Sequence, residues 1–467
     1  MAQSFHGVIA FALMVWMLLV GALLRRRIRW LQQGLVPASI IGGLLGWGLV
    51  SVGAFPGYTP KDFTVLTFHC FTLSFMSLCL TGSSAARPED TGIVWGGLWL
   101  TLIWTVSLGL QAVMGYGVVV AYNEVAGDGL SPLLGAMVTH GFTQGPGQAL
   151  TYGNLWEQQY GLNDAAQVGL IYASLGFLVA FLVGVPLARW LIRQRQARQP
   201  GQANAAEIDA SFLTGFYPAD ESRPVTGYMV SHPANLDSLA WHLGLLGVAY
   251  ILTHLWLTMM APVVAGVDLG GIRLSVFFDH NLFFIHGLVV CVLMRALINR
   301  MGWRSAVDDR SMQMLTGTAV DIMVVGTLMS IQFSVLKALL VPVTLVTVAI
   351  TLLTLFGCVW VARRSGRYGD ERAVTMFGCC CGSTGSGLLL LRILDPNYAS
   401  TVARELAFYN IAIVVVNFHV LYLFAPVAPS LSVSTYLLAF GGTSLLALLA
   451  IPLLGRSMKQ RASCREG

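Results

Sequence analysis

Long uninterrupted apolar runs constrain the fold of this chain more than any other feature of its sequence. A helix needs about 20 apolar residues to cross a bilayer. Only 10% of the residues are charged, against about 25% in soluble proteins. The sequence therefore predicts an all-α protein integral to the plasma (inner) membrane. The expected spans lie near 7–24, 36–53, 64–82, 92–122, 164–192, 240–263, 275–298, 312–333, 335–361, 402–424 and 431–455. The first run is uncharged until Arg25 and lacks an evident cleavage site, so we expect a retained span.

Arginine clusters between the apolar runs predict the topology. Two glycine-rich segments, near 131–153 and 373–392, interrupt the pattern. If neither crosses the membrane, an even number of spans separates each neighbouring pair of clusters, and all the clusters face one side. Because cytoplasmic loops are enriched in Lys and Arg, we expect the N-terminus outside and the C-terminus in the cytoplasm. The clusters are RRRIR (25–29), RWLIRQRQAR (189–198), RALINRMGWR (295–304), RRSGRYGDER (363–372) and RSMKQRASCR (456–465), and the opposite loops hold only Lys61, Arg273 and Lys337.

The two glycine-rich segments are predicted to be re-entrant, one dipping in from outside and the other from the cytoplasm. Non-helical backbone at membrane depth must be buried in protein or line a wet cavity. Such segments on opposite faces are typical of inverted-repeat secondary transporters. We expect five spans plus a re-entrant hairpin in each half, and one extra C-terminal span. The expected units are 1–192, a cytoplasmic linker at 193–239, the second half at 240–424, and the extra helix with a basic cytoplasmic tail at 425–467.

Three stretches of this sequence resemble the sodium:glutamate symporter family. LVPASIIGGLLG (35–46) is similar to the family's second span. GAMVTHGFTQGPGQAL (135–150) and the helix that follows at 160–192 are similar to its first re-entrant loop and next span. The glycine-rich GSTGSG (382–387) sits where the family has the partner loop. The family's first loop typically reads Gly-Gly-His-Gly-Thr, whereas this chain has Phe-Thr-Gln-Gly-Pro at 142–146.

The resemblance implies a dimeric carrier that imports glutamate with Na⁺ as the coupling ion, and a mobile unit that holds both hairpins. With this resemblance, we expect a cation-coupled secondary transporter that imports glutamate or a related small carboxylate by alternating access. The alternative is an H⁺-coupled or uncoupled carrier of another organic anion. A channel is a less favoured alternative. No nucleotide, zinc or Ser-His-Asp motif occurs, so we expect no enzyme, no cofactor and no protein-bound metal. The small net charge argues against a nucleic-acid partner.

The glycine-rich loops supply the groups that a small carboxylate needs. Half-helix N-termini offer free N–H groups and a partial positive charge, and hydroxyl and amide groups add hydrogen bonds. Arg392, which follows the glycines of the second loop, could bind a carboxylate through two hydrogen bonds. The alternatives are an ion pair with Asp395 or a position at the membrane interface. The alternative for the glycines is close helix packing. The predicted substrate residues are Thr143, Gln144, Gly145, Gly147, Gln148, Ser383, Thr384, Gly385, Ser386, Gly387 and Arg392.

A coupling cation needs oxygen ligands, and four residues are predicted to provide them. Thr143 and Thr384 lie in the two loops. Asp321 is an acid inside a predicted span, where charges are costly and usually functional. It could bind Na⁺, carry a coupling proton, or bond to a neighbouring helix. Asn410 and Asn417 share a helix face, which lines the site or joins two helices. The predicted ion residues are Asp321, Thr143, Thr384 and Asn410.

Overall fold

The computed structural model describes residues 2–81, 91–198, 210–218, 223, 225–362, 365, 368–396 and 398–466. These residues are almost entirely helical, apart from a two-stranded antiparallel ribbon of β1 (Asp268–Leu269) and β2 (Ile272–Arg273). In the first part of the chain the helices are α1 (Ala2–Arg27), α2 (Arg29–Gln33), α3 (Ala38–Ser51), α4 (Pro60–Leu80), α5 (Thr91–Ala126), α6 (Pro132–Ala136), the π-helix η1 (Thr139–Thr143), α7 (Pro146–Tyr160), α8 (Ala165–Leu182) and α9 (Gly184–Arg198).

After α9 the chain enters the predicted linker, of which residues 199–209, 219–222 and 224 lie outside the described part. The remaining helices are α10 (Ala210–Thr214), α11 (Ser238–Val264), η2 (Leu274–Phe278), η3 (His280–Leu282), α12 (Phe283–Arg300), η4 (Arg304–Ala306), α13 (Asp309–Met329), α14 (Phe333–Ala338), α15 (Leu340–Ala362), α16 (Gly369–Cys381), α17 (Thr384–Leu394), α18 (Val402–Val416), η5 (His419–Phe424), α19 (Ala425–Val427), η6 (Ala428–Ser430) and α20 (Val433–Glu466).

Nine helices among the described residues are long and apolar enough to cross a membrane. They identify an integral membrane protein, as the sequence predicted. The expected tenth span, 402–424, is bent by 47° between α18 and the helical stretch that begins at His419. The expected second span, 36–53, contains only the 14-residue α3. A helix of that length is about 21 Å long, which is shorter than the apolar core of a bilayer.

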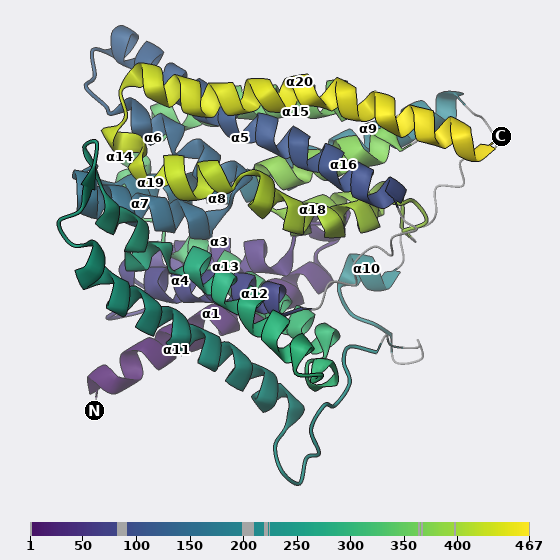
Figure 1. Cartoon of the computed structure of the whole chain (residues 1–467), viewed down its shortest axis with the longest axis horizontal. Helices are drawn as coiled ribbons and strands as arrows, with labels where there is room; N and C mark the ends of the chain where they lie inside the picture. Colours follow the sequence, from purple (N-terminus) through teal and green to yellow (C-terminus); the bar gives the residue numbers. More distant parts are fainter. Residues whose placement is uncertain are drawn as a thin grey trace.

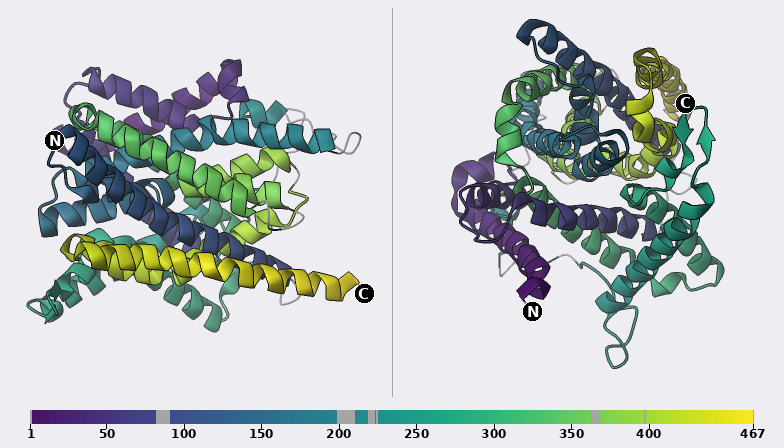
Figure 2. Two further views of the ribbon diagram at one scale, coloured as in Figure 1. Left: turned by 90° about the horizontal axis from the view of Figure 1, so that it is seen from above. Right: turned by 90° about the vertical axis from the view of Figure 1, so that its left-hand side faces the viewer.

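The long helices form two groups that pack against each other (Figures 1 and 2). One group contains α1, α3, α4, α11, α12 and α13, and its centre is the contact of α4 with α13. There Ser77 and Thr316 share a 2.7 Å hydrogen bond, and Gly326 leaves room for Thr67. The other group contains α5 to α9 and α15 to α20, with α5 packed against α18 and α20. The two chain ends lie at opposite ends of the bundle (Figure 2).

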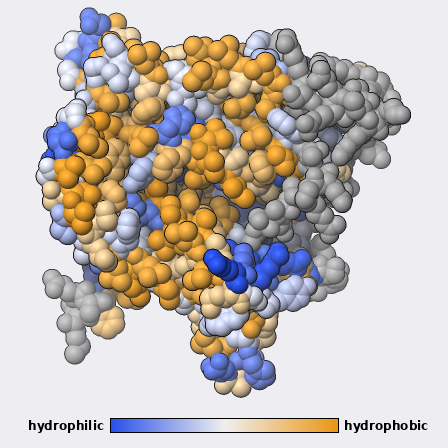
Figure 3. Space-filling view, viewed as in Figure 1, coloured by the Kyte–Doolittle hydropathy of each residue, from blue (hydrophilic) through white to orange (hydrophobic). Residues whose placement is uncertain are grey.

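Apolar side chains also cover the outer surface of the bundle. Figure 3, viewed from the same side as Figure 1, shows these apolar side chains spread across most of the described surface. On α11, Leu243, Ile251 and Met259 are exposed by 50%, 60% and 70%. A soluble protein rarely exposes an apolar patch of more than a few hundred Å², so this surface is suited to lipid.

Candidate functional site

The first glycine-rich segment folds as two helical arms joined by a break. The first arm consists of α6 and the π-helix η1, and the second arm is α7. At the break, Gly145 has φ 90° and ψ 177°, a conformation that is essentially restricted to glycine. Pro146 then occupies the first turn of α7, where its missing N–H costs no hydrogen bond. The sequence Gly-Pro therefore ends one helix sharply and begins the next.

The second glycine-rich segment has the same form, with α16 and α17 as its arms. The break lies at Gly382 and Ser383, and the Ser383 hydroxyl accepts a 3.2 Å hydrogen bond from the backbone N–H of Ser386. This is the usual role of a serine N-cap. The arms approach each other closely because Gly378 has no side chain. A Cβ at this position would lie 2.7 Å from the Cα of Gly387. We call the breaks at Gln144–Gly145 and Gly382–Ser383 the two tips.

The two tips meet in the interior of the second helix group. A Cβ at Gly145 would lie 3.9 Å from the carbonyl oxygen of Gly382. The Thr143 hydroxyl lies 3.2 Å from the carbonyl oxygen of Cys380. Since α7 and α17 both begin immediately after a tip, their N-termini approach each other across this contact. Helix N-termini carry a partial positive charge and unpaired N–H groups, so the junction is suited to an anion.

Gln111 of α5 holds the two tips together, and sequence reasoning missed it. Its Oε1 accepts a 2.7 Å hydrogen bond from Thr143, and its Nε2 donates to the carbonyl oxygen of Cys380 at 3.1 Å. The same Nε2 lies within hydrogen-bond distance of Ser107 and Thr354. The side chain is fully buried. A glutamine inside the apolar run 92–122 was the signal, because a buried amide in a membrane span requires partners.

Thr143 and Gln148 of the first tip are buried and Gln144 is partly buried, and the two glutamines keep unused hydrogen-bonding atoms. Thr143 and Gln148 are 4% and 5% exposed. Among the described residues, Gln144 Nε2 and Gln148 Oε1 are buried without a hydrogen-bond partner. Such atoms are costly unless a water, an ion or a ligand satisfies them. They give the first tip both a donor and an acceptor for a polar ligand.

At the second tip the structure brings together two of the four predicted ion residues. The Thr384 hydroxyl donates a 2.8 Å hydrogen bond to Asn410 Oδ1 on α18. Ser386 is buried, whereas Gly385 is exposed. With Thr143 and the carbonyl oxygen of Cys380, this tip region offers the oxygen atoms that a hard cation prefers.

Two of the predicted glycines serve packing instead, which was the alternative considered for them. A Cβ at Gly147 would overlap the ring of Phe71 on α4. A Cβ at Gly387 would collide with Cys379 and with the carbonyl oxygen of Thr375 on α16. The glycines of the two loops therefore divide by role. Gly145 provides the tip conformation, while Gly147 and Gly387 allow close contact between neighbouring helices.

Arg392 lies far along α17 from the tip. It lies eight positions after Thr384, which corresponds to about 12 Å along a helix. Its guanidinium lies 4.4 Å from the ring centroid of Phe212 in the linker helix α10. Asp395, the other partner considered for it, accepts hydrogen bonds from the backbone N–H groups of Ala399 and Ser400. A planar guanidinium stacks well on an aromatic ring, and this contact places Arg392 near the linker.

Asp321 lies on α13, in the first helix group. Its carboxylate accepts a hydrogen bond from Ser39 of α3, and the residue is exposed in the isolated chain. No hydrogen bond or ion pair among the described residues joins Asp321 to either tip. The structure therefore brings together Thr143, Thr384 and Asn410 near the tips and leaves Asp321 in the other group.

A buried ion pair beside the second hairpin was also missed. Arg372 of α16 and Glu405 of α18 form two hydrogen bonds, of 2.8 and 2.7 Å, with side chains only 6% and 1% exposed. The sequence placed Arg372 in a cytoplasmic cluster, because its neighbours in RRSGRYGDER are polar. In the fold, α16 begins at Gly369 and carries Arg372 inward against Glu405 and the ring of Trp99.

Comparison with known proteins assigns the chain to a family. The family model described as sodium/glutamate symporter matches residues 4–388. The sodium/glutamate symporter of Escherichia coli is 21% identical over 386 residues, which cover 82% of this chain and 87% of that protein. That of Haemophilus influenzae is 24% identical over 222 residues, which cover 45% of this chain and 51%, about half, of that relative. Because the family model spans well over half of the sequence, this chain belongs to the sodium/glutamate symporter family.

Proposed function

We propose that this protein is a secondary transporter, and not an enzyme, that imports glutamate or a related small carboxylate together with Na⁺ by alternating access. The observation that carries this proposal is the meeting of the two tips, which brings the N-termini of α7 and α17 close together. A carboxylate there would gain N–H donors and two positive helix ends. Thr143, Gln144, Gln148, Ser383, Thr384 and Ser386 surround the junction as candidate polar contacts. The names of the related proteins support the substrate and the coupling ion.

The proposed architecture is an inverted repeat of five spans and one re-entrant hairpin per half. Its support is the pattern of helix contacts. α4 contacts its counterpart α13, and α5 contacts its counterpart α15. The first hairpin packs on α5 through α6, as the second packs on α15 through α16. These contacts of the first half therefore resemble those of the second half, as expected for inverted repeats.

Contacts at the two ends of the bundle support the proposed topology. At one end, Gln159 of the first hairpin contacts Asp279, and Asn281 contacts Gln158. These residues belong to segments that charge parity places outside. At the other end, Arg195 pairs with Asp370 and Glu371 at the start of the second hairpin. Each hairpin would then begin and end on one side, with the N-terminus outside and the C-terminus in the cytoplasm.

Na⁺ is proposed to bind beside the second tip, where Thr384, Asn410 and Thr143 provide oxygen atoms. Asp321 is the candidate for a proton-coupled version of the mechanism, because it is an acid on α13 within a predicted membrane span. The homodimer implied by the family is also part of the proposal, and native mass spectrometry of detergent-purified protein would measure it.

Uptake by purified protein in liposomes tests the proposal. An inward Na⁺ gradient is expected to drive accumulation of labelled glutamate above its external concentration, and replacing Na⁺ with K⁺ is expected to abolish it. Accumulation driven by a proton gradient without Na⁺ would instead support the H⁺-coupled alternative. Flux that only equilibrates glutamate would indicate a channel. A screen of small carboxylates by Na⁺-dependent thermal stabilisation identifies the substrate, because a ligand that binds the folded state raises its melting temperature.

Replacing Gly145 with alanine is expected to reduce uptake about tenfold or more. Its backbone conformation costs a residue with a Cβ about 1–3 kcal/mol, and 1.4 kcal/mol corresponds to a factor of about ten. The strain would move the first tip away from the second. Gly127→Ala is the matched control, since Gly127 also has a positive φ of 71° but no neighbouring atom within 4 Å of an added Cβ. Equal uptake by both variants would show that the tip conformation is unimportant.

Replacing Arg392 with lysine is expected to leave substrate affinity unchanged within about twofold. The physical reason is its distance of about 12 Å along α17 from the tip and its contact with Phe212. Thr384→Val, at the tip itself, is expected to weaken Na⁺-dependent glutamate binding. Isothermal titration in detergent measures both. A large loss of affinity in Arg392→Lys alone would support the interpretation that Arg392 binds the substrate carboxylate.

A further inference from the structure

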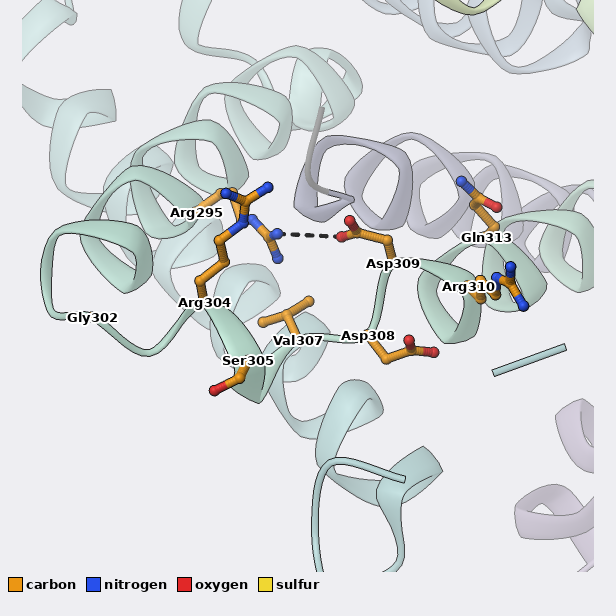
Figure 4. A pocket seen from close by; sticks show the side chains of 9 residues that line it. All are labelled: Arg295, Gly302, Arg304, Ser305, Val307, Asp308, Asp309, Arg310 and Gln313. Carbon is orange, nitrogen blue, oxygen red and sulfur yellow. Dashed lines mark hydrogen bonds and ion pairs between the residues drawn. The ribbon is translucent and has the colours of Figure 1, made fainter. Parts of the chain in front are cut away.

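A second polar site lies at the end of α12 and the start of α13, far from the tips in sequence and on the other helix group. It is a cavity of about 810 Å³. Figure 4 shows side chains from α12, from the turn that follows it and from α13 around this space. The proposed topology places this end in the cytoplasm. The lining residues are Arg295, Gly302, Arg304, Ser305, Val307, Asp308, Asp309, Arg310 and Gln313.

Arg295 is buried at this cavity with most of its hydrogen-bond donors unused. Its side chain is 8% exposed, and its Nη2 lies 3.2 Å from Asp309 Oδ1. Its Nε and Nη1 are buried and have no hydrogen-bond partner among the described residues. A guanidinium carries five N–H donors in a rigid fork. A buried cation with so few partners is costly, and an acceptor from outside the chain would satisfy it.

The acidic side chains of the cavity are already engaged. Asp308 accepts hydrogen bonds from the backbone N–H and the hydroxyl of Ser311, and from the backbone N–H of Tyr228. Asp309 accepts from Arg295. Arg304, by contrast, makes no ion pair or hydrogen bond with its side chain within the described part of the chain, and it is exposed. Donors therefore exceed acceptors, and positive charge exceeds negative charge around the cavity.

We propose that this cavity binds a phosphate-type oxyanion, held by Arg295 from within and by Arg304 from the rim. The forked guanidinium matches two oxygens of such an anion. Figure 4 shows the side chains of both arginines reaching into the cavity toward the side that Asp309 occupies. Arg310 contributes charge at the far side while its Nη1 donates to the carbonyl oxygen of Val225.

The residues around the cavity indicate that it lies at the membrane interface. Leu293 and Leu297 of α12 are 63% and 56% exposed, so this helix presents an apolar face to lipid. Trp303, next to Arg304, is 57% exposed, and tryptophan is enriched at membrane interfaces. Basic pockets at such a position bind the head groups of anionic lipids. The same chemistry would also accept dissolved phosphate, so the two sources need to be separated.

Melting of the full-length protein in a neutral detergent tests the proposal. Phosphatidylglycerol, phosphatidylcholine and inorganic phosphate are added separately. A rise in melting temperature with phosphatidylglycerol alone identifies a lipid head group, and a similar rise with inorganic phosphate identifies the free anion. Arg304→Ala is expected to abolish the rise. Arg300→Ala is the control, because Arg300 is exposed at the end of the same helix but does not line the cavity.

A second variant protects the test against a general loss of stability. Arg295→Lys keeps the charge but removes the fork, and it is expected to weaken the lipid-dependent or phosphate-dependent rise at least threefold in half-saturating concentration. The proposal is overturned if no additive raises the melting temperature, if phosphatidylcholine does so equally, or if Arg300→Ala and Arg304→Ala respond alike.

Discussion

Replacing Glu405 with glutamine is expected to lower the free energy of unfolding by about 3–5 kcal/mol, because it leaves a buried arginine without its counter-charge. Arg372 makes two short hydrogen bonds to Glu405, and both side chains are almost fully buried. Water cannot replace the lost carboxylate, since a Cβ at the neighbouring Gly96 would already collide with Glu405. The measurement is the shift of the thermal unfolding transition in detergent.

The matched control for this variant is Glu124→Gln, which makes the same chemical change at an exposed position on α5. It should shift the transition little. The double replacement Arg372→Met with Glu405→Leu should recover most of the stability, because apolar side chains of similar volume remove both charges together. If the single Glu405 variant melts like the control, the pair does not stabilise the fold. A double variant as unstable as the single one would show that packing, and not charge, is at stake.

Replacing Gln111 with leucine is expected to reduce the rate of glutamate uptake by roughly ten- to a hundredfold. The change removes the hydrogen bonds to Thr143 and to the carbonyl oxygen of Cys380 that link the two tips. The Thr143 hydroxyl can still donate to the carbonyl oxygen of Cys380 at 3.2 Å, so the loss is that of two hydrogen bonds, each worth about 0.5–1.5 kcal/mol. About 1.4 kcal/mol corresponds to a factor of ten. The arrangement that presents both helix N-termini to substrate would therefore be less populated. Initial uptake rates in liposomes, normalised to folded protein, measure the effect.

Thr105→Val provides the control for Gln111, because Thr105 is buried on the same helix and its hydroxyl donates to the carbonyl oxygen of Thr101 on that helix. It should retain uptake close to that of the unmodified protein. Glutamate-dependent thermal stabilisation gives a second readout that does not depend on reconstitution. A Gln111→Leu variant that binds and transports as Thr105→Val does would contradict a role for Gln111 in joining the tips.

Sequence patterns were sufficient to predict the class of protein and most of its membrane spans. The apolar core of a bilayer imposes a minimum length on any helix that crosses it. Nine of the expected spans could therefore be predicted as apolar runs, and each matches a long apolar helix among the described residues. The two glycine-rich segments were also legible, because glycine, proline and hydroxyl residues break the apolar pattern. The sequence also predicts Thr143, Gln144, Thr384 and Ser386 as polar residues of these segments. The length of the second span was overestimated, because the apolar run extends beyond both ends of the 14-residue helix α3.

Which of these residues meet depends on how the helices pack, and local sequence does not reveal this. The contact of Thr143 with Cys380 joins positions more than two hundred residues apart, and the role of Gln111 depends on that contact. Composition could not distinguish Gly145, which needs its backbone conformation, from Gly147, which makes room for Phe71. Charge counting placed Arg372 in a cytoplasmic cluster, and its burial against Glu405 is seen only in the packed structure. Local patterns report whether a segment prefers lipid or water, but the partners of a polar group depend on how distant segments pack.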